Sequence, residues 1–374
     1  MKVAILVLNR FTHDTRVLKT SETLRREFHD VTVVARHELS LPIFDVLESG
    51  VKVHRIPTGL KNWSSNRLVQ IVRLIVYTVK FVTNYRDSDV IHCNDLDGLL
   101  VGVICKLSRP SILIVYDSHE FASNNVPFQS KLSIFLTSLL ERSLIRFAKK
   151  VVCVSESIAS EYARLYGCDM PVVVLNCPRY IEQPRRDLFR QRLGIGSGQK
   201  IFLYQGLLSK GREVELLLKA FRSFDSNKCV LVFMGYGPLE NLVRDESKMN
   251  QAVFFHPAVS PDELLDFTAS ADYGVCFIKD SCLSKRYCLP NKVFEYLMAG
   301  LPIVTSNLVE LRRLVNGEGV GIMSKDNTVE CIENALVAAL ELDYPATRQN
   351  VFAARRKYCW EAQETILKKL YRYL

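Results

Sequence analysis

A short stretch near position 290 has residue types and spacing that could bind a nucleotide. Pro290 suits the start of a helix, and Gly300 suits the left-handed residue that ends one. Lys292 and Glu295 share one face of that helix, opposite an apolar face. The backbone N–H groups at the start of the helix, from Asn291 on, attract phosphate. A carboxylate about one turn later can accept hydrogen bonds from ribose hydroxyls. The alternative is an ordinary helix with an exposed Lys–Glu pair, which is common and weak.

The residues around this helix favour the nucleotide interpretation. The run from Leu289 to Tyr296 reads Leu-Pro-Asn-Lys-Val-Phe-Glu-Tyr. It resembles the donor-binding signature of retaining family 4 (group 1) glycosyltransferases, in the subgroup with the motif Leu-Pro-Asn-Lys-x-Phe-Glu-Tyr. The resemblance implies that Glu295 holds the ribose of a nucleotide-sugar. Further motifs follow the family's order along nearly the whole chain: Asp14–Lys19, Tyr116–Glu120, Tyr204–Gly206 and Trp360–Glu361.

Two positions depart from the family pattern. The family carries a second Glu eight residues before the ribose-binding one, and this chain has Tyr287 there. Because that Glu ordinarily touches the donor sugar, the resemblance does not say which sugar is bound. After the glycine that corresponds to Gly206, the family has an Arg and then a Lys. Here Leu207 and Arg212 take those places. Arg212 is then expected to bind phosphate oxygens through two parallel hydrogen bonds, unless it is only a solvated loop residue.

The same resemblance implies roles for other residues. His119 would touch the donor sugar and shape the reaction centre. Gly206 and Gly235 would let the backbone approach the phosphate and the base, because glycine has no side chain in the way. Asp14 and Arg16 follow the first predicted strand, where the family binds its acceptor. Asp14 could equally cap a helix.

Asp95 and Asp97 form an Asp-x-Asp pattern like the metal motif of the other major glycosyltransferase fold. We interpret them as caps for a helix that begins at Leu96, and keep Asp95 as an acceptor-binding candidate. Enzymes of the GT-B fold generally need no metal for chemistry, so no metal and no cofactor is expected. The nucleotide-sugar, which we expect to be UDP- or GDP-linked, is a substrate.

The elements that must position these residues alternate strand and helix. Strands are expected in the first half at 2–8, 31–35, 90–92, 112–116 and 151–154, with a helix over 15–27. The second half repeats the pattern with a helix over 214–223 and strands at 200–205, 230–234, 253–256, 273–277 and 303–305. This alternation predicts parallel sheets with helices on both faces, and ligands then bind beyond the carboxyl ends of the strands.

The predicted fold class is α/β, with two doubly wound, Rossmann-like domains facing a cleft in the GT-B architecture. An acceptor-binding domain is predicted over 1–177, and a donor-binding domain over 178–351. A C-terminal helix over about 352–374 is expected to cross back to the first domain. A chain of 374 residues is long enough for two such domains.

Composition limits the class of protein. Eleven cysteines without a Cys-x-x-Cys pair argue against a zinc site or disulfide framework, and for a reducing compartment. The net charge of +9 comes without an arginine-rich tract or an RNA-binding motif, so nucleic acid is not an expected partner. The apolar run at the start is short, and no run of about eighteen uncharged apolar residues occurs. We therefore expect a cytoplasmic protein.

Two stretches could bring the chain to a membrane. Residues 61–86 contain five basic residues and no acidic one, interleaved with apolar residues, and residues 131–150 are similar. Basic amphipathic helices can lie on anionic membrane surfaces, here the inner face of the cytoplasmic membrane, which would fit a lipid-linked acceptor. The alternative is that both stretches pack their apolar faces on the sheet of the first domain.

The predicted activity is that of a retaining glycosyltransferase. It would move a sugar from a nucleoside-diphosphate sugar to a glycan or lipid-linked acceptor, in cell-surface polysaccharide or lipopolysaccharide synthesis. Two alternatives stay open. One is an enzyme of the nucleotide-sugar epimerase type on the same fold. The other is a degenerate, non-catalytic subunit that binds nucleotide-sugar, which Tyr287 and Leu207 would suit.

Overall fold

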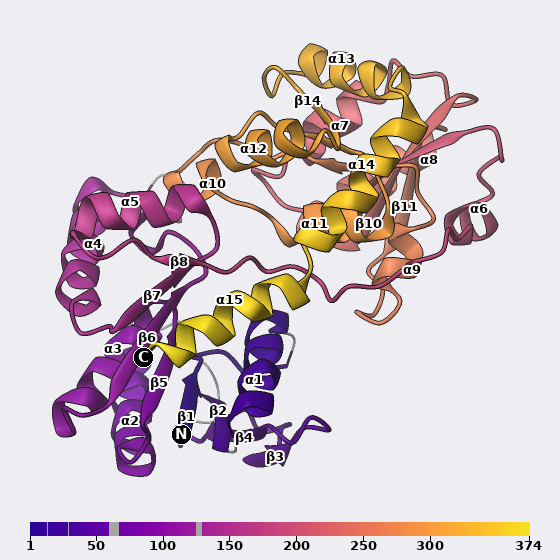
Figure 1. Ribbon diagram of the computed structural model, residues 1–374. Helices are drawn as coiled ribbons and strands as arrows, with labels where there is room; N and C mark the ends of the chain where they lie inside the picture. The colour runs from indigo at the N-terminus through magenta and orange to yellow at the C-terminus, as the bar shows by residue number, and fades with distance from the viewer. Residues whose placement is uncertain (13, 29, 60–66, 125–128) are drawn as a thin grey trace. The chain divides into compact units, whose positions relative to one another are not determined.

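The computed structural model describes residues 1–12, 14–28, 30–59, 67–124 and 129–374 (Figure 1). The chain divides into two compact units. Unit 1 comprises Met1–Leu175 and Glu364–Leu374, and unit 2 comprises Asn176–Gln363. The predicted boundary after residue 177 lies close to this division. The predicted return at about residue 352 is too early, because helix α14 (Tyr344–Lys357) packs on helix α11 (Asn291–Ala299) of unit 2.

Within the described ranges, unit 1 contains an 8-stranded sheet in the order β3-β4-β2-β1-β5-β6-β7-β8. Its strands are β1 (Lys2–Leu6), β2 (Asp30–Arg36), β3 (Phe44–Val46), β4 (Lys52–Ile56), β5 (Val90–Asn94), β6 (Leu113–Ser118), β7 (Lys150–Cys153) and β8 (Val172–Val173). The five strands predicted in this half are present. Neighbouring strands are parallel except β3, which pairs antiparallel with β4 and forms one edge of the sheet.

The helices of unit 1 connect these parallel strands. They are α1 (Thr15–Glu27), α2 (Arg67–Tyr85), α3 (Asp95–Ser108), η1 (Ala122–Asn124), α4 (Lys131–Ile145) and α5 (Glu156–Tyr166). The predicted helix over 15–27 is confirmed, and the Asp14 carboxylate accepts a hydrogen bond from the Val17 N–H at its start. Asp14 is therefore a helix cap, the alternative that the sequence left open.

Unit 1 also receives the last turns of α15 (Trp360–Arg372), drawn in yellow beside the indigo and purple elements in Figure 1. Lys368 forms an ion pair of 2.9 Å with Glu27 of α1. The Tyr371 hydroxyl lies 2.8 Å from Nδ1 of the buried His92 on β5. The predicted return of the C-terminal helix to the first domain is therefore confirmed.

Unit 2, over its described residues, contains a 6-stranded sheet in the order β11-β10-β9-β12-β13-β14, with every pair parallel. Its strands are β9 (Lys200–Leu207), β10 (Cys229–Tyr236), β11 (Val253–Pro257), β12 (Tyr273–Cys276), β13 (Ile303–Thr305) and β14 (Gly321–Met323). The predicted α/β class with two parallel-sheet domains is confirmed.

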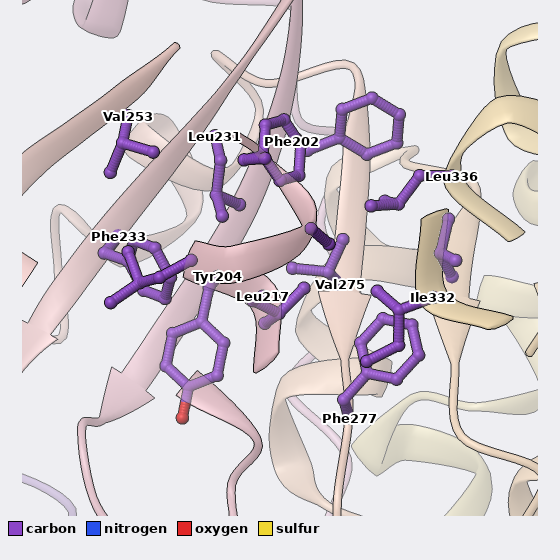
Figure 2. Packing of buried hydrophobic residues seen from close by; sticks show 14 of the residues in the cluster. Phe202, Tyr204, Leu217, Leu231, Phe233, Val253, Val275, Phe277, Ile332 and Leu336 are labelled. Carbon is purple, nitrogen blue, oxygen red and sulfur yellow. The ribbon is translucent and has the colours of Figure 1, made fainter. Parts of the chain in front are cut away.

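Helices and one large apolar cluster complete unit 2. Besides α11 and α14, its helices are α6 (Leu188–Leu193), α7 (Val214–Ala220), α8 (Glu240–Met249), α9 (Leu264–Thr268), α10 (Leu283–Arg286), α12 (Val309–Glu318) and α13 (Val329–Leu340). Figure 2 shows Phe202 and Tyr204 of β9 packed with Leu217 of α7 and Ile332 and Leu336 of α13. Burying each such side chain contributes about 1.5–3 kcal/mol, so this cluster fixes β9, whose carboxyl end carries the candidate site.

Candidate functional site

Helix α11 forms where the Pro290–Gly300 pattern predicts a helix. Pro290 occupies the N-cap with extended backbone, one position before the first helical residue Asn291. Gly300 ends the helix with a φ of 81°, in the left-handed region that favours glycine. Val293 and Phe294 are fully buried, while Asn291 is exposed. The polar face of the helix at Asn291 is therefore accessible to a ligand, while the Val293 N–H already donates to the Pro290 carbonyl.

Glu295 lies in the second turn of α11 and is partly exposed. Its carboxylate accepts a hydrogen bond from the side-chain amide of Gln205 on β9. The Gln205 amide oxygen in turn accepts a bond of 2.9 Å from the Thr268 hydroxyl. The carboxylate is thus oriented before any ligand binds. Sequence reasoning missed this role of Gln205, although it stands in the Tyr-Gln-Gly motif beside Gly206.

The Lys292 side chain reaches back from α11 to the carboxyl end of β9. Its ammonium nitrogen lies 3.9 Å from the centroid of the Tyr204 ring, and it also packs beside Gly206. Burial lowers the pKa of Lys292 to about 8; the charge of Arg212 adds to this, while Cys276 and Glu295 oppose it. A cation is therefore held in a partly desolvated position, where an incoming anion would be strongly stabilised.

The two predicted glycines bring the ends of β9 and β10 into backbone contact. Gly206 has a φ of 107°, which L side chains rarely adopt, and is exposed. A Cβ on Gly235 would collide with the carbonyl oxygen of Gly206. The two strands therefore approach each other closely at these glycines, and the backbone of Gly206 is exposed at the carboxyl edge of the sheet, where parallel sheets bind ligands.

Arg212 lies in the loop between β9 and α7 and is partly exposed. The charge of Arg212 lowers the pKa of Lys292, as expected of two cations on the same edge of unit 2. The next residue, Glu213, has a φ of 51°, and its carboxylate accepts a hydrogen bond of 3.4 Å from Asn327. A non-glycine residue in this region is strained, and such strain gathers at functional sites. The structure thus groups Gly206, Arg212, Gly235, Pro290, Asn291, Lys292 and Glu295 at one edge of unit 2.

In unit 1 a buried carboxylate, Asp117, organises the end of β6. Arg16 donates two hydrogen bonds to it, of 2.7 and 3.0 Å, and a third of 2.8 Å to the Val174 carbonyl. Burial would raise the pKa of Asp117, but Arg16, His119 and His92 hold it well below its usual range. The prediction that Arg16 binds the acceptor is corrected, because its guanidinium is buried and already bonded to Asp117 and Val174.

His119 follows β6 with about 20% of its side chain exposed. Its Nε2 lies 3.0 Å from the Asn94 side-chain oxygen, and its Nδ1 lies 3.6 Å from the Asp95 carboxylate. Desolvation lowers the pKa of His119, but Asp95 and Asp117 outweigh it and raise the pKa overall. His119 is therefore held at the carboxyl edge of the sheet with its charged form favoured.

Asp95 is not the helix cap that the sequence suggested. Helix α3 begins at Asp95 itself, with Asn94 at the N-cap. Asp95 has a φ of 58°, and its carboxylate accepts a hydrogen bond of 3.2 Å from the His119 N–H. Its side chain is more than half exposed, so it remains a candidate for acceptor binding. Across the part of the chain that the structure describes, no group of three His, Cys, Asp or Glu side chains gathers as a metal site.

Helices α2 and α4 each carry an apolar outer face. The exposed members are Leu68, Ile71, Val72, Ile75 and Val79 on α2, and Leu132, Phe135, Leu136, Leu139 and Leu140 on α4. Each helix buries one face and exposes apolar residues on the other, so packing inside unit 1 accounts for only part of each stretch. None of the described helices is long and apolar enough to cross a membrane.

The basic character predicted for α2 is only partly present. Arg73 is buried, with about 4% exposed, and Lys61 and the side chain of Arg67 lie outside the described residues. Lys80 is exposed and donates to the Pro57 carbonyl. Helix α4 and the turn after it expose more cations: Lys131, Arg142, Arg146 and Lys149.

Comparison with protein families agrees with this geometry. Residues 14–180 match the family described as Glycosyltransferase Family 4, and residues 199–341 match Glycosyl transferases group 1. The chain belongs to the family 4 (group 1) glycosyltransferases. The glycosyltransferase is 18% identical to the chitobiosyldiphosphodolichol beta-mannosyltransferase of Candida glabrata, in an alignment that covers 87% of this chain and 80% of that protein.

Solved structures with the same fold cover the whole glycosyltransferase. Sucrose-phosphate synthase from Thermosynechococcus elongatus has a TM-score of 0.79 at 16% identity, over 100% of this chain and 98% of that one. Anabaena HepE in complex with UDP-glucose has a TM-score of 0.77 at 15% identity, over 100% of both chains. WaaG, a glycosyltransferase involved in lipopolysaccharide biosynthesis, has a TM-score of 0.65 at 15% identity, over 98% of both chains. The fold is therefore GT-B.

Proposed function

We propose that this glycosyltransferase moves a sugar, with retention at the anomeric carbon, from a nucleoside-diphosphate sugar to a glycan or lipid-linked acceptor. The observation that carries the proposal is the edge of β9 and β10, where Lys292 and the oriented Glu295 flank the exposed backbone of Gly206. HepE, which has the same fold, contains UDP-glucose, and WaaG takes part in lipopolysaccharide biosynthesis. We accordingly propose a UDP- or GDP-linked donor and a role in cell-surface polysaccharide or lipopolysaccharide synthesis.

The residues of unit 2 would act on the leaving group. When the bond to the anomeric carbon breaks, negative charge develops on the departing nucleoside diphosphate. Lys292, Arg212 and the N–H groups at the start of α11 would stabilise that charge from fixed positions. Glu295 would accept hydrogen bonds from the ribose hydroxyls, and Gly235 would leave room for the base. On this view the departing phosphate takes the proton of the acceptor, and no metal takes part.

The residues of unit 1 would prepare the sugar and the acceptor. His119 would contact the donor sugar, held by Asn94 and by the carboxylates of Asp95 and Asp117. Asp95 is exposed beside it and would contact the acceptor. Arg16 would act only through Asp117, as a positioning residue.

The test is incubation with a panel of UDP- and GDP-sugars, with and without acceptor, in the presence of EDTA. We expect slow release of UDP or GDP with one donor, and a glycoside whose NMR coupling shows the anomeric configuration of the donor. An inverted product would contradict retention, and inhibition by EDTA would contradict a metal-free reaction. An epimerised nucleotide-sugar without acceptor would identify the epimerase alternative. Binding without any turnover would identify a non-catalytic subunit.

We further propose that the apolar outer faces of α2 and α4 rest on the anionic inner face of the cytoplasmic membrane. Apolar side chains beside exposed cations suit such a surface, because the apolar side chains can enter the lipid interface while the cations are attracted to anionic headgroups. Co-sedimentation with anionic vesicles should fall in high salt and in a Phe135→Ser/Leu139→Ser variant. A Val337→Ser variant changes an exposed apolar residue of unit 2 and should sediment like the parent. Equal sedimentation of all three proteins would contradict the proposal.

A further inference from the structure

A cavity of about 460 Å³ opens in unit 1. Its lining includes Leu8, which follows β1, Arg36, which ends β2, and Thr58, which follows β4. Because β4, β2 and β1 are parallel neighbours, these residues lie at the carboxyl edge of the sheet. His119 follows β6 at the same edge of that sheet. The cavity is therefore placed where parallel sheets bind ligands.

The polar part of the cavity carries positive charge. Arg36 and Arg73 both line it, and Arg73 projects from α2 with about 4% of its surface exposed. Burial lowers the pKa of Arg36, and the neighbouring charges of Arg10 and Arg73 lower it further, while Glu38 opposes them. Glu38 is itself paired with Arg10 at 2.8 Å.

Among the described residues that line the cavity, Asp97 is the one acid, and it is exposed. Two guanidinium groups and one exposed carboxylate are therefore the charged groups among the described lining residues. Guanidinium groups bind phosphate oxygens through parallel hydrogen bonds, and Gln70 and Thr58 add further polar groups to the walls. The cavity suits an anion that has several oxygen acceptors.

The rest of the cavity is apolar and leads onto the outer face of α2. Leu74 and Tyr77 line it from α2, together with Ile71. Ile71 is about 54% exposed and also belongs to the apolar outer face of α2. A ligand whose anionic end lies at Arg36 and Arg73 could therefore continue along that face as a hydrocarbon chain.

We infer that this cavity binds the phosphate of a lipid-phosphate acceptor, with Arg36 and Arg73 on the phosphate oxygens and the outer face of α2 against the lipid chain. The inference rests on the proposed function and deepens it, because it names the chemical class of the acceptor. A phosphorylated glycan without lipid shares the phosphate chemistry but leaves the apolar part of the cavity unused.

The test is calorimetric binding of decyl phosphate to the full chain, with UDP added to occupy the donor site. Decyl maltoside and inorganic phosphate supply the lipid chain and the anion separately. We expect decyl phosphate to bind at least about tenfold more tightly than either. Arg36→Gln and Arg73→Gln should each weaken it by about tenfold or more, as expected for lost charge-assisted bonds. Lys80→Gln removes a cation of α2 outside the cavity and should leave the affinity for decyl phosphate unchanged.

Arg73 is buried, so its variant is informative only if thermal unfolding shows a parent-like transition; the partly exposed Arg36 supplies the second variant. Unchanged binding in Arg36→Gln would overturn the inference, as would equal affinity for decyl maltoside and decyl phosphate. Inorganic phosphate that binds as tightly as decyl phosphate would overturn the lipid assignment. If the parent protein binds decyl phosphate but turns over none of the nucleotide-sugars, the proposed function is refuted and the inference about the cavity is not.

Discussion

Replacing Lys292 by Met should stabilise the unliganded protein and weaken its binding of nucleoside diphosphates. The fall of the Lys292 pKa from 10.5 to about 8 corresponds to about 3 kcal/mol of unfavourable free energy for keeping this charge in the folded state. The side chain is partly exposed, and the variant also loses the contact with the Tyr204 ring. We therefore expect a gain of about 1–2 kcal/mol in the free energy of unfolding at pH 7.

The gain should depend on pH in a defined direction. Since the folded pKa of Lys292 is depressed, the unfolded chain binds more protons between pH 8 and pH 10.5. The stability of the parent protein relative to the variant therefore rises over that interval. Thermal unfolding of the parent and of Lys292→Met at pH 7 and pH 10 measures this. The difference in melting temperature should shrink at the higher pH.

Binding should change in the opposite sense. Loss of a charge-assisted hydrogen bond costs about 1.5–3 kcal/mol, so the affinity of Lys292→Met for UDP should fall by about tenfold or more at pH 7. Above pH 8 the affinity of the parent should also fall, because Lys292 loses its proton. Lys248→Met, at a highly exposed lysine of unit 2, serves as the control. A Lys292→Met protein that melts below the parent and binds UDP equally well would refute this reasoning.

Three further substitutions test the two units separately. Glu295→Ala should weaken nucleoside diphosphate binding by about 1.5–3 kcal/mol in calorimetry, with the circular dichroism spectrum unchanged. Arg212→Met should weaken diphosphate more than monophosphate, because its expected partner is the β-phosphate; equal losses would place Arg212 elsewhere. Arg16→Met leaves Asp117 buried without its main cation and should lower the free energy of unfolding in urea by about 3–5 kcal/mol. A loss under about 1 kcal/mol would contradict that ion pair.

The sequence predicts best those helices and strands whose signals lie within the segment itself. Helix α1 and strand β13 have the predicted bounds, because periodicity and end signals lie within each segment. Strands β3, β4, β8 and β14 were not predicted. β3, β8 and β14 have only two or three residues and no fully buried position, and Lys52, His54 and Arg55 interrupt the apolar pattern of the five-residue β4. The equally short β13 was predictable because its three residues are all β-branched and buried.

The candidate site was predictable as a set of residues but not as a set of contacts. Motif positions identified Glu295 and Lys292, yet the amide that orients Glu295 comes from Gln205, 90 positions away. Arg16 and Asp117 are 101 positions apart, so nothing local indicated that one neutralises the other. Such pairings depend on how strands are ordered in the sheet, which a single sequence does not record.

The return of residues 364–374 to unit 1 has a consequence for biosynthesis. Unit 1 begins to fold while its chain emerges, but Tyr371 is added only after all of unit 2 has been translated. At about 5–20 residues per second, residues 176–363 take roughly 10–40 s to synthesise. Throughout that interval the His92 ring on β5 lacks its hydroxyl partner, and Glu27 lacks Lys368. Unit 1 therefore matures last although it is made first, and a nascent chain halted within unit 2 carries an incomplete first domain.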